Sequence, residues 1–334
     1  MITKRNIHPK IIFIFSWKLL LYASLLSTAV CVCYEILGWK FLSVPFLPIG
    51  TIGTAVAFYI GFKNNAAYDR LWEARKIWGG IVNSSRSFGT WVSNWVNHES
   101  LSDDELQKIK KELIYRHLAY INVLRTQLRK TSVWDGHNYH EISSKATGET
   151  LAEMYIKNVK YISANFLNEK EKKELPHKTN KATYLLKEQS AQLTELKRKR
   201  LFTEFEHSDI EKMIEAFFNY QGAAERIKTF PFPRQYGFFS QVFVAIFITL
   251  LPFGLVSVIA EHSFVWITIP ASILISWIFQ TMEDVGDSSE NPFENGINDV
   301  PLNAICRTIE IDLKEMLDEE NIPEKLKPVN DVLM

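Results

Sequence analysis

Three residues of one apolar stretch, Thr54, Phe58 and Phe62, have the spacing of a functional surface. They stand at i, i+4 and i+8, so a helix places them on one face about 12 Å long. Small residues, which let helices approach closely in a membrane, lie around them: Gly50, Gly53, Ala55, Ala57 and Gly61. One such helix offers only a packing seam. Several symmetric copies would instead form stacked apolar rings able to control water and ions, and the positive edges of the phenyl rings would modestly favour anions.

Signatures of enzymes and metal sites are missing from the sequence. It contains no P-loop, G-x-G-x-x-G, G-x-S-x-G or H-E-x-x-H motif. His137 and His140 form an H-x-x-H pair without nearby Cys, which favours a surface loop over a zinc site. The three cysteines read as small buried residues: Cys31, Cys33 and Cys306. We therefore expect no catalytic residues, no cofactor and no metal site.

Four apolar segments must position the Thr54–Phe62 face. They cover about residues 11–37, 44–62, 236–260 and 263–282. Each approaches the roughly 20 apolar residues that cross a hydrocarbon core, and none has the polar face of a soluble helix. The only carboxylate in them is Glu35 at a segment end, so the proton relay of a carrier is absent. The sequence predicts an all-α, multi-pass membrane protein with four transmembrane helices.

Lysine and arginine residues predict the orientation. They cluster before the first segment, after the second and before the third, while the connectors 38–43 and 261–262 hold only Lys40. By the positive-inside rule, both termini and residues 63–235 face the cytoplasm, which suits a bacterial inner membrane. The first segment, with an apolar run of about 27 residues, is too long for a cleaved signal peptide.

The formal net charge of the 334 residues is zero, with 38 basic and 38 acidic side chains. This balance disfavours a nucleic-acid-binding protein, and three cysteines exclude a disulfide scaffold. The zero conceals unlike parts. Residues 1–62 carry five basic and one acidic side chain (+4), residues 63–235 carry 29 and 22 (+7), and residues 236–334 carry four and 15 (−11). The acidic part could line a vestibule.

Residues 63–235 read as helix almost throughout. Capping boxes at Ser102–Glu105 and Ser208–Glu211 precede helical patterns. The pattern that begins in the second apolar segment runs on to about residue 88, which predicts one long helix leaving the membrane. Pro231 and Pro233 should interrupt the helices before the third segment. The basic run at 197–200 is a solvated helix face or, alternatively, a phosphate or lipid site.

Three motifs resemble the bestrophin family, particularly its bacterial members. They are GFKNNAAYDRLWEARKIWGGIVNSSRSF at 61–88, ENPFENGINDVPLNAICRTIE at 290–310 and TFPFPRQY at 229–236. With four apolar segments in the corresponding places, the resemblance covers about residues 1–315. It implies a homopentameric ion channel with a central pore.

The resemblance implies that the pore neck consists of Thr54, Phe58 and Phe62. The outermost neck residue of the family is usually aliphatic, so Thr54 is a departure and the outer ring should be wetter. A second, cytosolic constriction is expected somewhere in 200–212. The 61–75 stretch reads as structural, because side chains at such varied helical angles cannot all face one axis; its members are Gly61, Asn64, Asn65, Tyr68, Asp69, Arg70, Trp72, Glu73 and Arg75.

Animal members of the family bind calcium in an acidic cluster after an Asn-Pro-Phe sequence. Here Asn291-Pro292-Phe293 is followed by few carboxylates, and calcium prefers several charged oxygens. Asn291 and Asp299 are therefore interpreted as degenerate calcium-clasp positions, and no tight calcium binding is expected.

Four regions are expected from these patterns. Residues 1–62 hold a cytosolic N-terminal segment and two transmembrane helices, 63–235 a helical cytosolic domain, and 236–282 the other two transmembrane helices. Residues 283–334 form a cytosolic segment packed on that domain. The leading function is a channel for chloride and other monovalent anions. The alternatives are a Na⁺ or K⁺ channel of the same fold and a non-conducting membrane adaptor that recruits a cytosolic partner.

Overall fold

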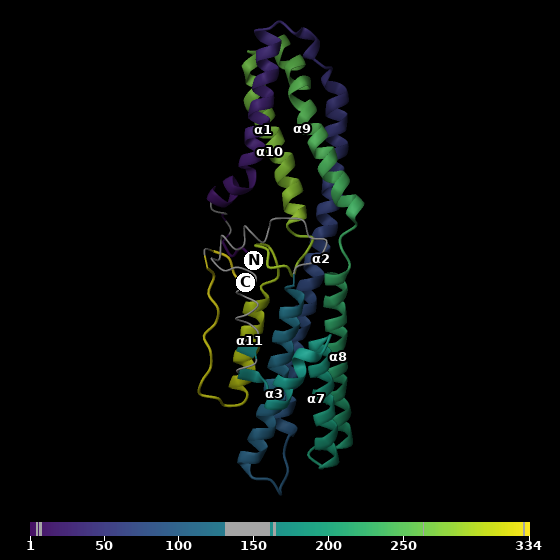
Figure 1. The fold of residues 1–334 in the computed structure, drawn as a ribbon, viewed down its shortest axis with the longest axis vertical. Helices are drawn as coiled ribbons and strands as arrows, with labels where there is room; N and C mark the ends of the chain where they lie inside the picture. The colour runs from purple at the N-terminus through teal and green to yellow at the C-terminus, as the bar shows by residue number, and fades with distance from the viewer. Residues whose placement is uncertain (5, 7–8, 131–160, 163–164, 263, 330) are drawn as a thin grey trace. The chain divides into compact units, whose positions relative to one another are not determined.

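The computed structural model describes residues 1–4, 6, 9–130, 161–162, 165–262, 264–329 and 331–334. Within these residues the regular elements are helices, and strand pairing is limited to isolated bridges at Ile2, Val329 and Val332. The helices are α1 (Pro9–Glu35), α2 (Phe46–Trp95), α3 (Asp103–Leu128), α6 (Glu169–Glu174), α7 (Lys181–Arg198), α8 (Glu204–Thr229), α9 (Arg234–His262), α10 (Thr268–Asp287) and α11 (Leu302–Glu315) (Figure 1). Short 3₁₀ turns occur at Lys40–Leu42, Leu175–His177 and Val265–Ile267. The prediction of an all-α protein is confirmed.

Two compact units divide the chain. The first, here called the spanning unit, comprises Lys4–Leu71 and Pro231–Asn291; the second comprises Met1–Thr3, Trp72–Phe230 and Pro292–Met334. Four helices are long and apolar enough to cross a membrane: α1, the early part of α2, α9, and α10 with the 3₁₀ turn before it. The four predicted segments are therefore confirmed as helices of spanning length. The protein is a multi-pass membrane protein.

The spanning unit is a bundle in which α1 packs against α10 and α9, and α10 packs against α9. The first half of α2 joins it through an apolar cluster with α9 that includes Ile49, Val56, Val244 and Phe247. Gly53 permits the close approach, because a Cβ there would overlap the Phe247 ring. Helices that are apolar on almost every side thus still use one particular face to contact each other.

Helix α2 is 50 residues long and contributes to both units. In the spanning unit its buried side chains follow a spacing of three or four residues: Ile49, Gly53, Val56, Ile60, Lys63 and Ala67. Spacing of this kind marks one helix face. The predicted continuation of one helix past the second apolar segment is confirmed. Proline also ends helices as predicted, since α8 stops at Thr229 and α9 starts at Arg234.

In the second unit α3 packs against α7, α8 and α11, and α7 packs against α8. The capping box at Ser102 is confirmed: its hydroxyl accepts from the Glu105 N–H, and the Glu105 carboxylate accepts from the Ser102 N–H. The second predicted box is wrong. Thr203 and Glu206 form the reciprocal pair at the start of α8, which places Ser208 inside the helix. The Thr203 pair begins the helix five residues earlier, and its side chains satisfy the backbone N–H groups of Thr203 and Glu206.

His117 lies in the core of the second unit among the aromatic rings of Phe88, Tyr120 and Phe217. Its Nε2 is 2.9 Å from the Ser85 hydroxyl, which gives its own proton to the Ile81 carbonyl. The Nε2 atom is therefore the protonated one, and Nδ1 is buried without a partner. Burial lowers the pKa of His117 from 6.5 to about 3, so the ring is neutral in the folded protein.

Candidate functional site

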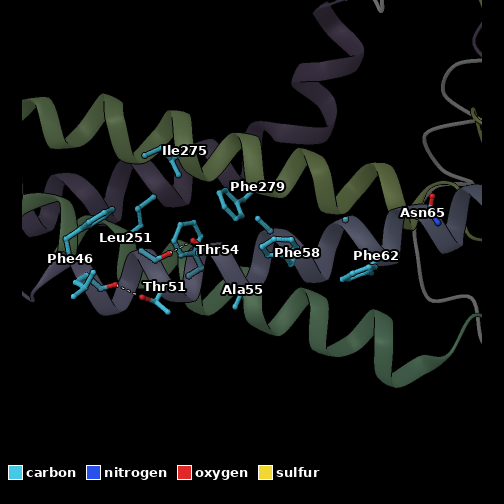
Figure 2. A pocket seen from close by; sticks show the side chains of 16 residues that line it. Phe46, Thr51, Thr54, Ala55, Phe58, Phe62, Asn65, Leu251, Ile275 and Phe279 are labelled. Atoms are coloured by element: carbon cyan, nitrogen blue, oxygen red, sulfur yellow. Dashed lines mark hydrogen bonds between the residues drawn. The ribbon is translucent and has the colours of Figure 1, made fainter.

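The predicted neck residues lie on the face of α2 that the spanning unit leaves uncovered. Phe58 and Phe62 are each 66% exposed, and Thr54 is exposed as well. Figure 2 shows Thr54, Phe58, Phe62 and Asn65 in order along α2. All four line one hollow of about 1460 Å³. Two large aromatic side chains exposed in a membrane-spanning helix leave this face available for a pore or for another helix.

The far wall of the hollow is apolar. Phe247 and Leu251 come from α9, and Ile275 and Phe279 come from α10. The Phe247 and Phe279 rings pack against each other with centroids 4.5 Å apart. Because this wall is built from packed side chains, it is a fixed surface beside the neck residues rather than a loose rim.

Thr54 differs from its phenylalanine neighbours in what it presents. Its hydroxyl donates to the Gly50 carbonyl at 3.0 Å, and Thr51 makes the same bond to Leu47 at 2.9 Å (Figure 2). With its proton used within the helix, the Thr54 oxygen offers lone pairs to the hollow beside a methyl group. The Thr54 end of the face is therefore more polar than the Phe58–Phe62 part.

Directly behind Phe62, a buried ionic cluster joins three helices of the spanning unit. The Lys63 ammonium of α2 donates to Glu283 and Asp287 of α10. On α9, Ser240 donates to the other Glu283 oxygen, and Gln241 donates to Asp287 at 2.8 Å. Every charged group of this cluster is at most 7% exposed. The cluster fixes the rotation of α2 immediately beside the neck position.

Sequence reasoning missed this cluster, although the chain carries a signal for it. Glu283 and Asp287 are four residues apart, so they share one face of a helix at the end of the fourth apolar segment. Structure alone shows that Lys63, 220 positions away from Glu283, is the base that they contact.

The recognisable 61–75 stretch divides into two faces. Asn64 turns toward α10, where its Nδ2 donates to the Met282 carbonyl at 2.8 Å and its Oδ1 is buried without a partner. Gly286 makes room for it, because a Cβ at that position would overlap Asn64 Oδ1. Arg70 donates through Nε to the Glu290 carbonyl at 2.9 Å. These residues hold α2 against α10 and against the segment that follows it.

The opposite face carries Gly61, Asn65, Tyr68 and Asp69, which are all exposed. Gly61 and Asn65 line the same hollow as Phe58 and Phe62. These two residues therefore lie beside the hollow, and the structural role expected for the stretch stays a prediction. The signal was available in the spacing, since Asn65 follows Phe62 by three residues and Asp69 follows by seven.

The rest of the stretch belongs to the second unit. The Arg75 guanidinium stacks over the Trp72 ring at 5.7 Å from its centroid, and Glu73 pairs with Lys76 at 2.8 Å. Contacts of this kind stabilise the exposed surface of α2 without forming a binding site.

Four acidic residues of the C-terminal part are buried and form ion pairs within the fold. In the second unit the buried Glu294 pairs with Lys228 at 2.6 Å. The buried Glu310 pairs with Arg307 and Lys314 and accepts from the Tyr161 hydroxyl. With Glu283 and Asp287 bound to Lys63, the idea that these acids line a vestibule is wrong for all four. Each of these carboxylates is buried against a basic side chain inside the protein.

The degenerate calcium-clasp positions fall in different units. Asn291 is the last residue of the spanning unit, and its Nδ2 donates to Glu290 Oε1 at 3.4 Å. Asp299 is buried in the second unit, where burial raises its pKa and the Arg129 charge partly offsets this rise. Across the described residues, no group of three His, Cys, Asp or Glu side chains is placed to hold a metal ion. His137 and His140 lie outside the described residues.

Comparison with known proteins assigns the chain to a family. The family described as "Bacterial/Fungal Bestrophin protein" matches residues 1–315. The voltage-dependent anion channel-forming protein YneE of Salmonella typhi is 29% identical over 312 residues, which cover 92% of this chain and 89% of that protein. The protein of the same name from Escherichia coli is 29% identical over 295 residues, which cover 88% of this chain and 83% of that protein.

Solved structures agree on the fold. A bacterial bestrophin homologue from Klebsiella pneumoniae, phased by zinc anomalous scattering, superimposes with a TM-score of 0.74 at 23% identity. The match covers 90% of this chain and 98% of that one. The motifs, the four spanning helices and the family match over residues 1–315 lead to one conclusion: this chain belongs to the bestrophin family.

Proposed function

We propose that this protein is an anion channel, with chloride the favoured ion, and not an enzyme. The observation that carries the proposal is the exposed Phe58–Phe62 face of α2, within a helix of spanning length. Support also comes from the relatives in Salmonella and Escherichia coli, which are named as anion channel-forming proteins.

The proposed pore runs along this face in an assembly of identical chains. A single chain cannot enclose a pathway with one helix, but copies arranged around an axis would turn each exposed residue into a ring. Five copies are expected from the family resemblance. In such an assembly Thr54, Phe58 and Phe62 form the neck, with the more polar Thr54 ring at its outer end.

The neck would act by controlling water. Rings of phenyl groups make a narrow apolar passage, and an ion crosses it only when the passage is hydrated. Phenyl edges carry partial positive charge, so rings turned edge-on toward the axis would stabilise anions modestly.

The proposal puts the protein in a bacterial inner membrane with both termini and residues 63–235 in the cytoplasm, as the lysine and arginine distribution favours.

A Na⁺ or K⁺ channel of the same arrangement is the second candidate, and one observation favours it. Asp69 is exposed on α2, on the side of Phe62 away from Thr54. A carboxylate there would attract cations to the pathway and oppose the weak preference of the phenyl edges.

Electrical recording tests the proposal. The purified full-length protein is placed in planar bilayers with unequal KCl on the two sides, and the reversal potential is measured. A reversal potential near the chloride equilibrium value is the expected result. A reversal potential near the potassium equilibrium value would contradict the anion channel and favour the cation channel instead. Absence of current would reject a channel, and a monomeric mass in detergent would contradict the central pore.

A further inference from the structure

The neck face of α2 does not end at Phe62. At about 100° per residue, Asn65 and Asp69 both lie within about 20° of the direction of Phe58. Asn65 lines the hollow that Phe58 and Phe62 line, and Asp69 follows one turn later, about 10 Å along the helix from Phe62. Both side chains are exposed. The face therefore passes from aromatic to amide to carboxylate.

Asp69 keeps its charge available to solvent. Within the described part of the chain, no hydrogen bond or ion pair engages its carboxylate. Two bases of α2 in the same unit are engaged elsewhere: Lys63 is bound by Glu283 and Asp287, and Arg70 donates to the Glu290 carbonyl. Neither base neutralises Asp69.

Two other acids of the spanning unit do not present a charge to this face. Glu283 and Asp287 are buried and bound by Lys63, with Ser240 and Gln241 occupying further oxygens. From Thr54 to Tyr68 the exposed residues of α2 are uncharged. Asp69 is thus the first charged residue on the neck face beyond Phe62.

We infer that Asp69, with Asn65 before it, weakens the anion preference that the phenyl rings give the pathway. This inference rests on the proposed channel function and deepens it. In an assembly, Asp69 forms a ring of carboxylates at the inner end of the neck, which concentrates cations and repels anions. Asn65 forms an uncharged ring of amides that replaces part of the water around an ion before it meets Phe62.

The direct test is Asp69→Asn in the full-length protein, with the reversal potential measured in a KCl gradient. We expect the ratio of chloride to potassium permeability to rise by about threefold or more, since one charge per subunit is removed at a few ångströms from the ion. Asn65→Asp adds a carboxylate one turn closer to Phe62, and the ratio should fall. The Asp69→Asn effect should shrink in about 1 M salt, where the Debye length is about 3 Å.

Asp103→Asn is the matched control, because Asp103 is an exposed carboxylate in the first turn of α3 and its loss should leave the ratio unchanged. Unchanged ratios in both Asp69→Asn and Asn65→Asp, with current present, would overturn the inference and leave the channel standing. An equal shift in Asp103→Asn would also overturn it. No current in the unmodified protein would reject the channel and the inference together.

Discussion

Phe62 and Lys63 are consecutive residues of α2, about 100° apart around the helix axis, and only the first of them is exposed. Phe62 is 66% exposed, whereas Lys63 is 0% exposed and holds Glu283 and Asp287 of α10. The buried ion pairs of Lys63 and the exposed ring of Phe62 are therefore attached to adjacent backbone positions. The rotation that buries the ammonium is the rotation that exposes the phenyl ring.

Lys63→Met should destabilise the spanning unit. Removing the ammonium leaves two buried carboxylates without their base, and breaking buried pairs of this kind costs about 3–5 kcal/mol. The expected result is a clear fall in the unfolding temperature of the detergent-solubilised protein, measured by circular dichroism.

Two further variants separate charge from packing. Adding Glu283→Gln and Asp287→Asn to Lys63→Met should recover much of the loss, because no buried charge then remains in the cluster. Lys76→Met removes an exposed lysine paired with Glu73 and should cost at most about 1 kcal/mol. Equal losses for Lys63→Met and Lys76→Met would show that the cluster has no special role.

Gly286→Ala tests the contact between α10 and α2. An added methyl group would overlap Asn64 Oδ1, so side chains must shift, and overpacking of this kind costs about 1–3 kcal/mol. Gly222→Ala in α8 is the control, since a Cβ there meets nothing within 4 Å. The control should be neutral or stabilising by up to about 1 kcal/mol. A Gly286→Ala protein as stable as the control would contradict the packing described here.

His117 predicts a loss of stability in acid. Its pKa is about 3 when folded and 6.5 ordinarily, so the unfolded chain binds the proton over the interval between these values. Stability from the neutral ring is fully present above pH 6.5 and falls as the pH drops toward 3, by about 1.4 kcal/mol per pH unit.

His117→Phe removes this titration while keeping a ring in the aromatic core. The difference in unfolding temperature between neutral pH and about pH 4 should become smaller than in the unmodified protein. His177→Gln changes an exposed histidine and should leave that difference as it was. If His117→Phe retains the full acid sensitivity, the buried neutral ring is not its source.

Much of the fold follows from local pattern. Apolar segments of sufficient length locate the four spanning helices, and the uninterrupted helical pattern after Phe62 gives the continuation of α2. The start of α8 was predicted wrongly, at Ser208, for a physical reason. Thr203–Glu206 and Ser208–Glu211 both satisfy the capping pattern, and the choice of the earlier one becomes apparent only in the folded chain.

The charge distribution shows where local pattern ends. Counting residues gives charges of +4, +7 and −11 in three regions. However, the acids Glu283, Asp287, Glu294 and Glu310 are buried against bases, and the first three of these acids pair with bases that are distant in the sequence. Pairing over such separations depends on tertiary packing, which sequence spacing does not encode. The exposed Thr54–Phe58–Phe62 face was different, because a single helix determines which of its residues share a face.

Conductance after removal of the two phenyl rings tests the central claim most directly. Phe58→Ala combined with Phe62→Ala, recorded in planar bilayers, should raise the conductance, because the apolar passage becomes wider and easier to hydrate. Phe238→Ala combined with Phe239→Ala removes two exposed rings from α9 and should leave the conductance unchanged. An unchanged conductance in the Phe58 and Phe62 variant, or an equal rise in the α9 variant, would contradict the proposed neck.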